Sequence, residues 1–265
     1  MTSSKDKLEC IVRGMETYFR TFALADNVRL HARDVEWITP NPGSAGPSLV
    51  YQVSLDESTV DERLAEMLPE LQAGVIPSLW VISSTSTPAD VADHLHAIGF
   101  TGGLDAAHPE PGMALDLDEF APGLGLGPSS DIEISVVASS TEFAAWIDVV
   151  NEALHGWNLL SIEHYRAWLE HAPYTFYLGC HGGTPVATLA TLRDREAASV
   201  EFVSTLKAYR RKGVATALCV KAVQDLRLKR VRLVTLRSGT EAISVYARLG
   251  FKPYYEQHLL SYPLG

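Results

Sequence analysis

The sequence predicts an α/β protein built around one dominant sheet. Short runs rich in β-branched and aromatic residues alternate with helical stretches along the chain. The 265 residues exceed one small domain and suit two of ordinary size. A segment rich in glycine and proline, residues 109–130, divides the elements into an earlier and a later series, and its later part, 121–130, is typical of a linker.

The earlier series contains three expected strands and two expected helices. The strands are residues 34–38, 48–54 and 78–84, and the helices are Val60–Gln72 and Ala89–Ala97. The later series is longer and alternates more regularly. It comprises a strand at 132–137, helices at Thr141–Leu154 and Ile162–Glu170, strands at 174–181, 185–193 and 199–205, a helix at Val214–Leu228, a strand at 231–237, a helix at Glu241–Leu249 and a final strand.

The two series end alike. A helix closes on Gly99-Phe100 in the first and on Gly250-Phe251 in the second, and an apolar strand lies at a similar distance upstream of each pair. Glycine ends a helix in the left-handed conformation, and the following phenylalanine anchors the next strand. The matching order of helix, strand, helix, Gly-Phe and strand predicts an internal duplication.

Composition and charge exclude several classes of function. The formal net charge of −10 repels phosphate backbones, so we expect no nucleic-acid partner. No apolar run approaches the roughly 20 residues of a membrane span, and the N-terminus has no signal-peptide pattern, so we expect a cytoplasmic protein without a membrane partner. The cysteines and histidines show no metal-ligand spacing, and we expect no metal. Cys219, within an apolar helical run, is expected to be a buried free thiol.

A basic turn stands out in this acidic chain. An apolar strand runs into Arg210-Arg211-Lys212-Gly213, and a helix begins at the glycine. A helix N-terminus presents unpaired N–H groups and a positive dipole end, and Gly213 and Ala215 carry no bulk that would keep an anion from the backbone. The turn therefore predicts a pyrophosphate site, although a basic turn before a helix is by itself often only a cap.

The context of the turn resembles the GNAT superfamily of N-acetyltransferases. The run Arg210-x-x-Gly213-x-Ala215 is similar to the family's acetyl-CoA signature, and Ala242, Tyr246 and Gly250-Phe251 resemble its downstream motif. The resemblance implies a mixed central sheet flanked by helices, classed α/β or α+β, in two tandem GNAT-like domains. Residues 131–265 would be the acetyltransferase domain, and 1–120 a degenerate one without the cofactor motif, because its equivalent helix starts with acidic residues.

The resemblance implies direct transfer of an acetyl group from acetyl-CoA to a primary amine. Tyr246 would be the general acid and Glu201 the general base. The expected cofactor-binding residues are Val203, Ser204 and Thr205 beside the pantetheine arm, Arg210, Arg211, Lys212, Gly213, Val214, Ala215 and Thr216 around the pyrophosphate, and Ser238 where the family often has asparagine.

The acceptor is expected between the first two helices of the second half. His155, Trp157 and Asn158 in their connecting loop are the candidate substrate-binding residues, whereas Trp146, Tyr165 and Trp168 lie at helical spacings typical of core. A non-catalytic acyl-CoA sensor and a transferase for another acyl-CoA remain alternatives. The small-molecule or peptide nature of the amine, and the choice between a monomer and a homodimer, stay open.

Overall fold

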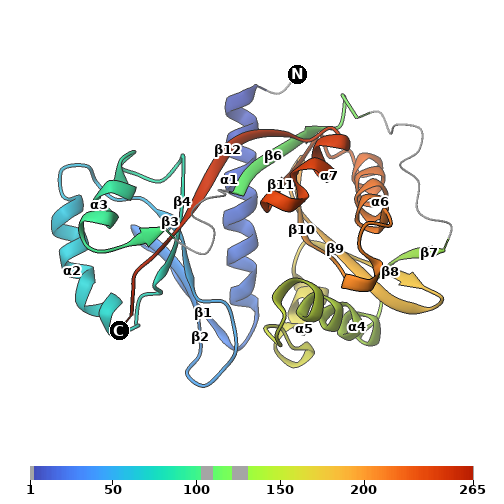
Figure 1. Ribbon diagram of the computed structural model, residues 1–265, viewed down its shortest axis with the longest axis horizontal. Helices are drawn as coiled ribbons and strands as arrows, with labels where there is room; N and C mark the ends of the chain where they lie inside the picture. Colours follow the sequence, from blue (N-terminus) through green and yellow to red (C-terminus); the bar gives the residue numbers. More distant parts are fainter. Residues whose placement is uncertain (1–2, 103–109, 121–130, 265) are drawn as a thin grey trace.

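The fold is a long mixed sheet that runs through the whole molecule, with helices on both faces (Figure 1). The computed structural model describes residues 3–102, 110–120 and 131–264. We call the described residues up to 120 the N-terminal half and those from 131 the C-terminal half. None of the helices in these ranges is long and apolar enough to cross a membrane.

The N-terminal half begins with a long helix that the sequence alone did not predict. Helix α1 (Ser4–Thr21) starts at a capping box in which Ser3 and Asp6 exchange hydrogen bonds between side chain and backbone. The remaining elements of this half are β1 (Val28–His31), β2 (Val35–Pro40), β3 (Leu49–Val53), α2 (Val60–Gln72), β4 (Leu79–Ser83), α3 (Val91–Ala97), β5 (Thr101–Gly102) and β6 (Glu110–Asp116).

The C-terminal half follows the order expected from the sequence. Its elements are β7 (Ile132–Val136), α4 (Ser140–Val150), a π-helical turn at Asn151–His155, α5 (Ile162–His171), β8 (Tyr174–His181), β9 (Thr184–Asp194), β10 (Ala197–Thr205), α6 (Val214–Leu228), β11 (Leu233–Arg237), α7 (Ile243–Arg248) and β12 (Lys252–Ser261).

The strand order shows that the two halves are built alike. The order is β1-β2-β3-β4-β12-β6-β11-β10-β9-β8-β7, with β5 paired to β12. The pairs β3–β4 and β10–β11 are parallel, and every other neighbouring pair is antiparallel. Each half therefore leads from antiparallel strands to one parallel pair, in mirrored order, which agrees with the predicted duplication.

The halves share strands across their boundary. β6, from the N-terminal half, pairs with β11, whereas the C-terminal strand β12 pairs with β4, and β6 and β12 pair with each other. The sequence places residues 110–116 in the glycine- and proline-rich divide between the halves, so the strand there is a finding of the structure. The linker predicted at 121–130 lies outside the described residues, and the domain boundaries stay a prediction. The exchange means that each half completes the sheet of the other.

Helices cover the central strands on two faces. On one face, α1 packs Ile11 and Val12 against Ala197 of β10 and Leu233 of β11. Side chains from α1, α4 and α5 continue this layer in a second cluster. On the opposite face, α6 and α7 pack against β10 and β11. We refer to these as the α1 face and the α6 face.

Candidate active site

The centre of the C-terminal half is a split between two parallel strands. β10 and β11 pair from Ala197↔Leu233 to Ser199↔Thr235, although both strands run on beyond that point. β10 is also irregular there, because its register with β9 shifts between Glu201 and Ser204. A positive φ of 53° at Phe202 marks this bulge. The β11-facing backbone edge of 200–205 is thus left without a strand partner.

The predicted pantetheine-binding residues lie along this open edge. Val203, Ser204 and Thr205 form the last part of β10. The Ser204 hydroxyl is 2.6 Å from that of Thr188 on β9, so it is occupied within the sheet. By contrast, the Thr205 Oγ1 is buried and has no hydrogen-bond partner. A buried hydroxyl without a partner is costly, and its place beside the open edge suits a polar ligand.

The basic turn delivers an open helix N-terminus. Gly213 precedes α6 in the left-handed conformation, with φ of 77°, and no side chain caps the helix. The first intrahelical bond runs from Ala217 N to Gly213 O, so the preceding N–H groups have no helical acceptor. A Cβ at Gly213 would meet no atom within 4 Å. The amides and the positive end of the helix dipole therefore face open space.

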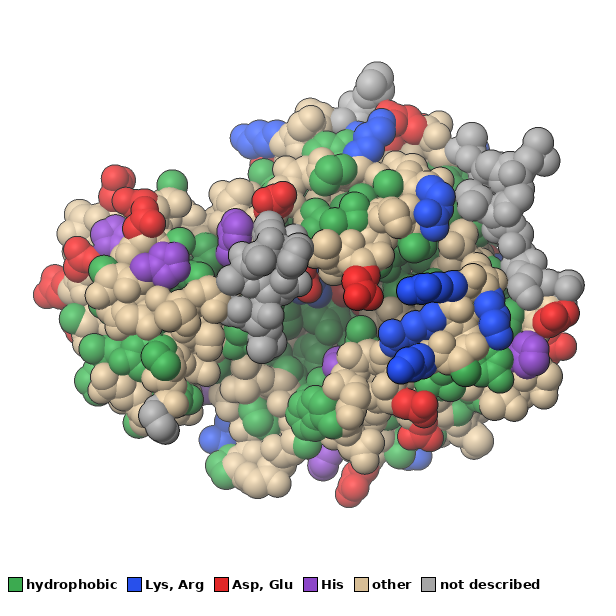
Figure 2. All heavy atoms as spheres, in the orientation of Figure 1, with side chains coloured by type: hydrophobic (Ala, Val, Ile, Leu, Met, Phe, Trp, Pro, Cys, Tyr) green, Lys and Arg blue, Asp and Glu red, His purple; other side chains and the backbone are tan. Residues whose placement is uncertain are grey.

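A cavity of about 220 Å³ lies at this helix end. Arg248, on α7, lines it together with residues of the turn, and it was not predicted from the sequence. The complete lining is Thr205, Tyr209, Arg210, Arg211, Gly213, Val214, Ala215, Thr216, Val245 and Arg248. Figure 2 shows lysine and arginine side chains gathered beside a hollow between the halves. Local positive charge on an acidic protein fits an anionic ligand.

The basic residues of the turn differ in their contacts. The Arg210 guanidinium donates to Thr205 O at 2.9 Å and to Ala153 O at 3.0 Å, so it braces the end of β10 against the turn after α4. The Lys212 Nζ lies 5.2 Å from the centre of the Tyr209 ring and does not line the cavity. Arg211 and Arg248 have no hydrogen-bond partner among the described residues, and their guanidinium groups are free to meet phosphate.

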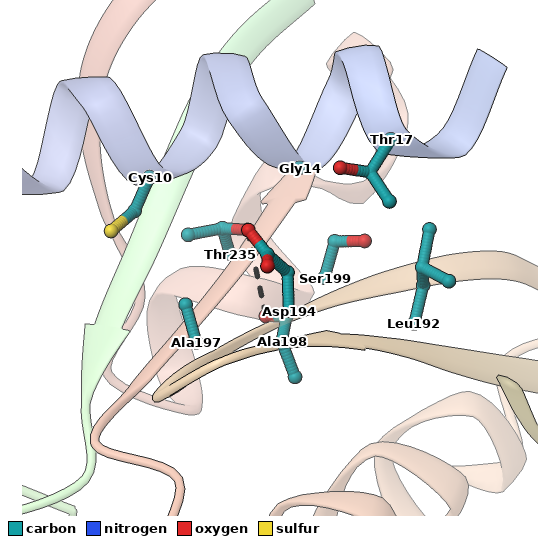
Figure 3. Close-up of a pocket in the computed structure, with 9 residues that line it drawn as sticks. All are labelled: Cys10, Gly14, Thr17, Leu192, Asp194, Ala197, Ala198, Ser199 and Thr235. Carbon is teal, nitrogen blue, oxygen red and sulfur yellow. Dashed lines mark hydrogen bonds between the residues drawn. The ribbon is translucent and has the colours of Figure 1, made fainter. Parts of the chain in front are cut away.

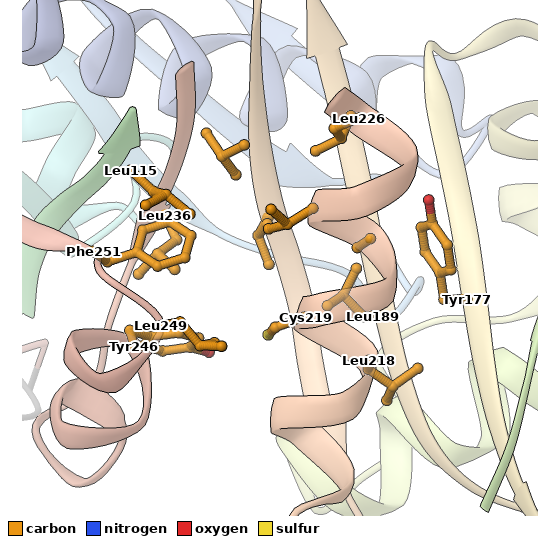
Figure 4. Close-up of a cluster of buried hydrophobic side chains, with 14 of the residues drawn as sticks. Leu115, Tyr177, Leu189, Leu218, Cys219, Leu226, Leu236, Tyr246, Leu249 and Phe251 are labelled. Atoms are coloured by element: carbon orange, nitrogen blue, oxygen red, sulfur yellow. The ribbon is translucent and has the colours of Figure 1, made fainter. Parts of the chain in front are cut away.

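Tyr246 lies on the α6 face, in the core between α7 and α6. Its ring meets Phe251 edge to face at 6.0 Å, and Figure 4 shows its hydroxyl pointing toward α6, where Cys219 lies. The side chain is 6% exposed, and its hydroxyl is bonded to no described residue. Burial raises the pKa of Tyr246 well above the usual tyrosine value. The phenol therefore keeps its proton at neutral pH.

Glu201 lies on the α1 face, at the start of the split. Its Oε2 accepts a hydrogen bond from Arg237 Nη2 at 3.3 Å, and both side chains are largely buried. This ion pair joins β10 to β11 where their backbone ladder ends. Burial raises the pKa of Glu201, and the Arg237 charge opposes that rise. The two predicted catalytic residues thus lie on opposite faces of the sheet, and the split connects the faces.

Ser238 follows β11 and is buried. Its backbone N–H donates to Pro111 O at 3.1 Å, and its hydroxyl donates to Gly239 O at 2.9 Å. Both groups are used to shape the turn between β11 and α7, and a contact from Ser238 to the cofactor stays a prediction.

The loop predicted to bind the acceptor extends from the π-helical turn to α5. His155 is half-buried, burial lowers its pKa, and its Nε2 has no hydrogen-bond partner. Trp157 is 54% exposed, and Asn158 lines a cavity of about 270 Å³ between α4 and the start of α5. Neither Glu201 nor Tyr246 lines that cavity. The substrate-binding role of the three residues stays a prediction.

One buried amide holds this loop in place. Asn151 Nδ2 donates to Leu160 O at 2.8 Å, and its Oδ1 accepts from Leu160 N at 3.0 Å. Replacing Asn151 with alanine leaves both backbone groups of Leu160 unpaired, so we expect a loss of about 2 to 3 kcal/mol in the free energy of unfolding. Denaturant titration measures it. Asn158→Ala, at an exposed position of the same loop, should change stability by no more than about 0.5 kcal/mol. Equal losses in the two variants would contradict this role of Asn151.

The comparison with known families decides the identity of this half. Residues 143–251 match the family model described as the acetyltransferase (GNAT) family. They form a GNAT acetyltransferase domain. The match contains the split, the basic turn, α6 and α7, and it assigns the protein to the acyltransferases. No curated protein matches the chain.

Solved structures extend the similarity from the GNAT domain over both halves of the chain. A GCN5-related N-acetyltransferase from Kribbella flavida has 19% identity and a TM-score of 0.66, with 96% of each chain covered. A tandem GNAT protein from the clavulanic acid biosynthesis pathway has 15% identity and a TM-score of 0.62, covering 96% of this chain and 95% of its own. A GCN5-related N-acetyltransferase from Sphaerobacter thermophilus has 17% identity and a TM-score of 0.62, covering 86% and 80%. At these identities the likeness shows the fold, and the fold is that of a tandem GNAT protein.

The N-terminal GNAT-like half lacks an open split. Beyond β3 and β4, Leu55 N donates to Thr87 O at 3.0 Å, and Thr87 N donates to Val53 O at 3.0 Å. These bonds occupy backbone groups of the N-terminal half that correspond to the groups left unpaired on β10. The first turn of α2 carries Asp61 and Glu62, whose charges oppose an anion at a helix N-terminus. Both features agree with the degenerate cofactor site expected from the sequence.

The remaining expectations concern core residues and metals. Trp146, Tyr165 and Trp168 are fully buried, as predicted for core positions. Cys219 is a buried free thiol, as predicted. Within the described ranges, no group of three or more histidine, cysteine or acidic side chains is arranged to hold a metal ion.

Proposed function

We propose that the C-terminal GNAT domain binds acetyl-CoA and transfers its acetyl group directly to a primary amine. The observation that carries the proposal is the open N-terminus of α6, which faces a cavity lined by Arg211 and Arg248 beside the unpaired edge of β10. Backbone amides, helix dipole and guanidinium groups together match the charge of a pyrophosphate. The unpaired edge of β10 offers hydrogen-bond donors and acceptors to an extended amide-containing arm such as pantetheine.

The two proton-transfer steps are assigned to side chains on opposite faces of the sheet. The neutral amine attacks the thioester carbonyl carbon, and Glu201 takes the proton that nitrogen loses as the C–N bond forms. The C–S bond then breaks, and Tyr246 donates its proton to the leaving sulfur. Glu201 returns its proton through solvent to the tyrosine oxygen, so the domain regains its starting state. Because burial raises the pKa of Tyr246, the phenol still carries its proton when the thiolate leaves.

The first test is calorimetric titration of the purified protein with acetyl-CoA, beside an Arg248→Glu variant. We expect the variant to bind about tenfold more weakly, since a carboxylate replaces a phosphate-facing guanidinium. Arg166→Glu makes the same charge change at an exposed position of α5 and should leave the affinity unchanged. An equal loss in both variants would mean that overall charge, and not the cavity, governs binding.

A second readout separates the enzyme from a non-catalytic sensor. A sensor binds acetyl-CoA but releases no CoA thiol when amines are added, whereas the transferase releases one thiol for each amine acetylated. Failure of the wild-type protein to bind acetyl-CoA or any other acyl-CoA would overturn the proposed function.

A further inference from the structure

A polar row crosses the sheet on the α1 face, at the seam between the halves. Glu201 and Arg237 come from the GNAT domain, and Tyr255 and Gln257 come from the shared strand β12. Glu110, on β6, completes the row. Arg237 and Tyr255 both stand opposite Gly112 in register, and Gln257 stands opposite Glu110. Alternate residues of a strand share a face, so these positions adjoin on one side of the sheet.

The seam closes tightly around Arg237. Its guanidinium carbon lies 4.9 Å from the centre of the Tyr18 ring and 5.1 Å from that of Phe19, both at the C-terminal end of α1. The Tyr255 ring lies directly over Gly112, where an added Cβ would clash with it. Only glycine at this position lets the aromatic ring lie flat across β6. Arg237 is therefore enclosed by aromatic rings and paired with Glu201.

Two polar atoms of the row have no partner. Tyr255 is 7% exposed and Gln257 is 2% exposed, yet Tyr255 Oη and Gln257 Oε1 make no hydrogen bond. The orientation of the Gln257 amide is fixed by its nitrogen, because Nε2 donates to Glu110 Oε2 at 2.7 Å and Oε1 points away from that carboxylate. Buried polar atoms are rarely left unpaired, since the lost hydration is not replaced. Two such oxygens on adjacent positions of one face indicate a place for a polar ligand: Gln257 Oε1 requires a hydrogen-bond donor, and the Tyr255 hydroxyl can accept from the same ligand or donate to it.

The charges of the row indicate what kind of donor it takes. The row holds two carboxylates, Glu110 and Glu201, and one guanidinium, Arg237, so its formal charge is −2 + 1 = −1. The unpaired Gln257 Oε1 can only accept hydrogen bonds, and the Arg237 charge is already used by Glu201 and covered by rings. This chemistry favours a cation rich in N–H or O–H groups and disfavours a carboxylate.

The place of the row also fits an acceptor. The candidate acetyl-CoA cavity and Tyr246 lie with α6 and α7, whereas the row lies on the α1 face, with Glu201 at the split between them. Farther along α1, the space between the helix and β9–β11 is only about 10 Å³, because Gly14 packs on Ser199 and Thr235 (Figure 3). That space holds no more than about one water molecule. Figure 2 shows a hollow between the two halves.

We propose that the acceptor is a small cationic amine with further N–H or O–H donors and no carboxylate, bound at the seam by Glu110, Tyr255 and Gln257. The inference rests on the proposed acetyl transfer and assigns its substrate class. One ammonium of the acceptor loses a proton to solvent and attacks beside Glu201, while its second donor group bonds the unpaired oxygens of β12. The N-terminal half thereby contributes directly to substrate binding through β6.

The test uses two probes that differ in one group, 1,4-diaminobutane and 4-aminobutanoate. Each is titrated calorimetrically into the full-length protein saturated with CoA, and each is assayed for thiol release with acetyl-CoA. We expect the diamine to bind about tenfold more tightly than the amino acid, and to be acetylated with the higher kcat/KM. Tighter binding of 4-aminobutanoate, or no binding of the diamine, would overturn the assigned class.

Variants locate the site. Gln257→Leu should weaken diamine binding about tenfold and leave acetyl-CoA affinity unchanged. Gln52→Leu is the matched control, because Gln52 also has a buried unpaired Oε1 but lies on β3. Tyr255→Phe keeps the ring over Gly112 and removes only the hydroxyl, so it tests the site even if the first variant does not fold. Unchanged diamine affinity in folded Gln257→Leu or Tyr255→Phe would overturn the site. Diamine binding without thiol release would instead count against the proposed catalysis.

Discussion

Gly213→Glu is expected to abolish acetyl-CoA binding, with a loss of affinity of about 100-fold or more. The substitution places a carboxylate at the N-terminus of α6, where the free amides and the helix dipole attract an anion. A side-chain carboxylate there would take the place of the pyrophosphate and repel it. Because the carboxylate both repels the pyrophosphate and fills its place, the loss of affinity should exceed that caused by losing one arginine. Calorimetric titration with acetyl-CoA measures it.

The control variant must introduce the same backbone strain as Gly213→Glu. Gly213 has φ of 77°, and a residue with a Cβ in that conformation costs about 1 to 2 kcal/mol. Gly74, at the end of α2, has φ of 70° and equally open surroundings. Gly74→Glu therefore adds the same strain and the same charge in the N-terminal half. We expect both variants to lose similar stability and only Gly213→Glu to lose binding. If Gly213→Glu bound acetyl-CoA within about threefold of wild type, the phosphate site would have to lie elsewhere.

Local patterns are what allow a candidate cofactor site to be proposed from the sequence. The basic turn, Gly213 and the start of α6 are consecutive in the sequence, and a helix N-terminus binds anions by virtue of its own backbone. The Gly250-Phe251 pair likewise marks the end of α7 by local conformation, with Gly250 at φ of 96°. Such features need no knowledge of distant residues.

The residues that the sequence did not reveal depend on contacts between distant segments. Arg248 lines the cavity at the start of α6 because α7 packs beside that helix end, and nothing in the sequence of α7 indicates which way this side chain points. Arg237 meets Tyr18 across more than two hundred residues. Strand β6 was hidden because glycine and proline lower strand propensity. In the fold, Gly112 is required by the Tyr255 ring.

The exchange of β6 and β12 between the halves is likewise a contact between distant segments, and it makes the domain boundary hard to predict from the sequence. A boundary read from composition divides the chain where glycine and proline gather, whereas the sheet joins segments on both sides of that division. The capping box of Ser3 and Asp6 was a usable signal for α1. The position of α1 at the seam could not be predicted from that signal, because α1 contributes to the seam only when the two halves are joined. The proposed acceptor site at the seam therefore depends on residues that only the tertiary structure brings together.

Tyr246→Phe is expected to lower kcat for thiol release about 100-fold and to leave acetyl-CoA affinity unchanged. The ring would still pack against Phe251, so the variant removes only the proton donor. Because burial raises the pKa of Tyr246, the wild-type phenol keeps its proton as pH rises past neutrality, and its loss should be felt across that range. Stopped turnover assays with a saturating amine give kcat, and titration gives the affinity.

Tyr165→Phe provides the matched control for this prediction. Tyr165 is also buried, its hydroxyl also has no hydrogen-bond partner, and burial raises its pKa in the same direction. It lies in the aromatic cluster of α1, α4 and α5, away from the α6 face. Loss of its hydroxyl should leave kcat unchanged. A Tyr246→Phe enzyme as fast as wild type would mean that solvent protonates the leaving thiolate. The tyrosine would then be a packing residue beneath Phe251, and the open helix N-terminus alone would carry the resemblance to the family's chemistry.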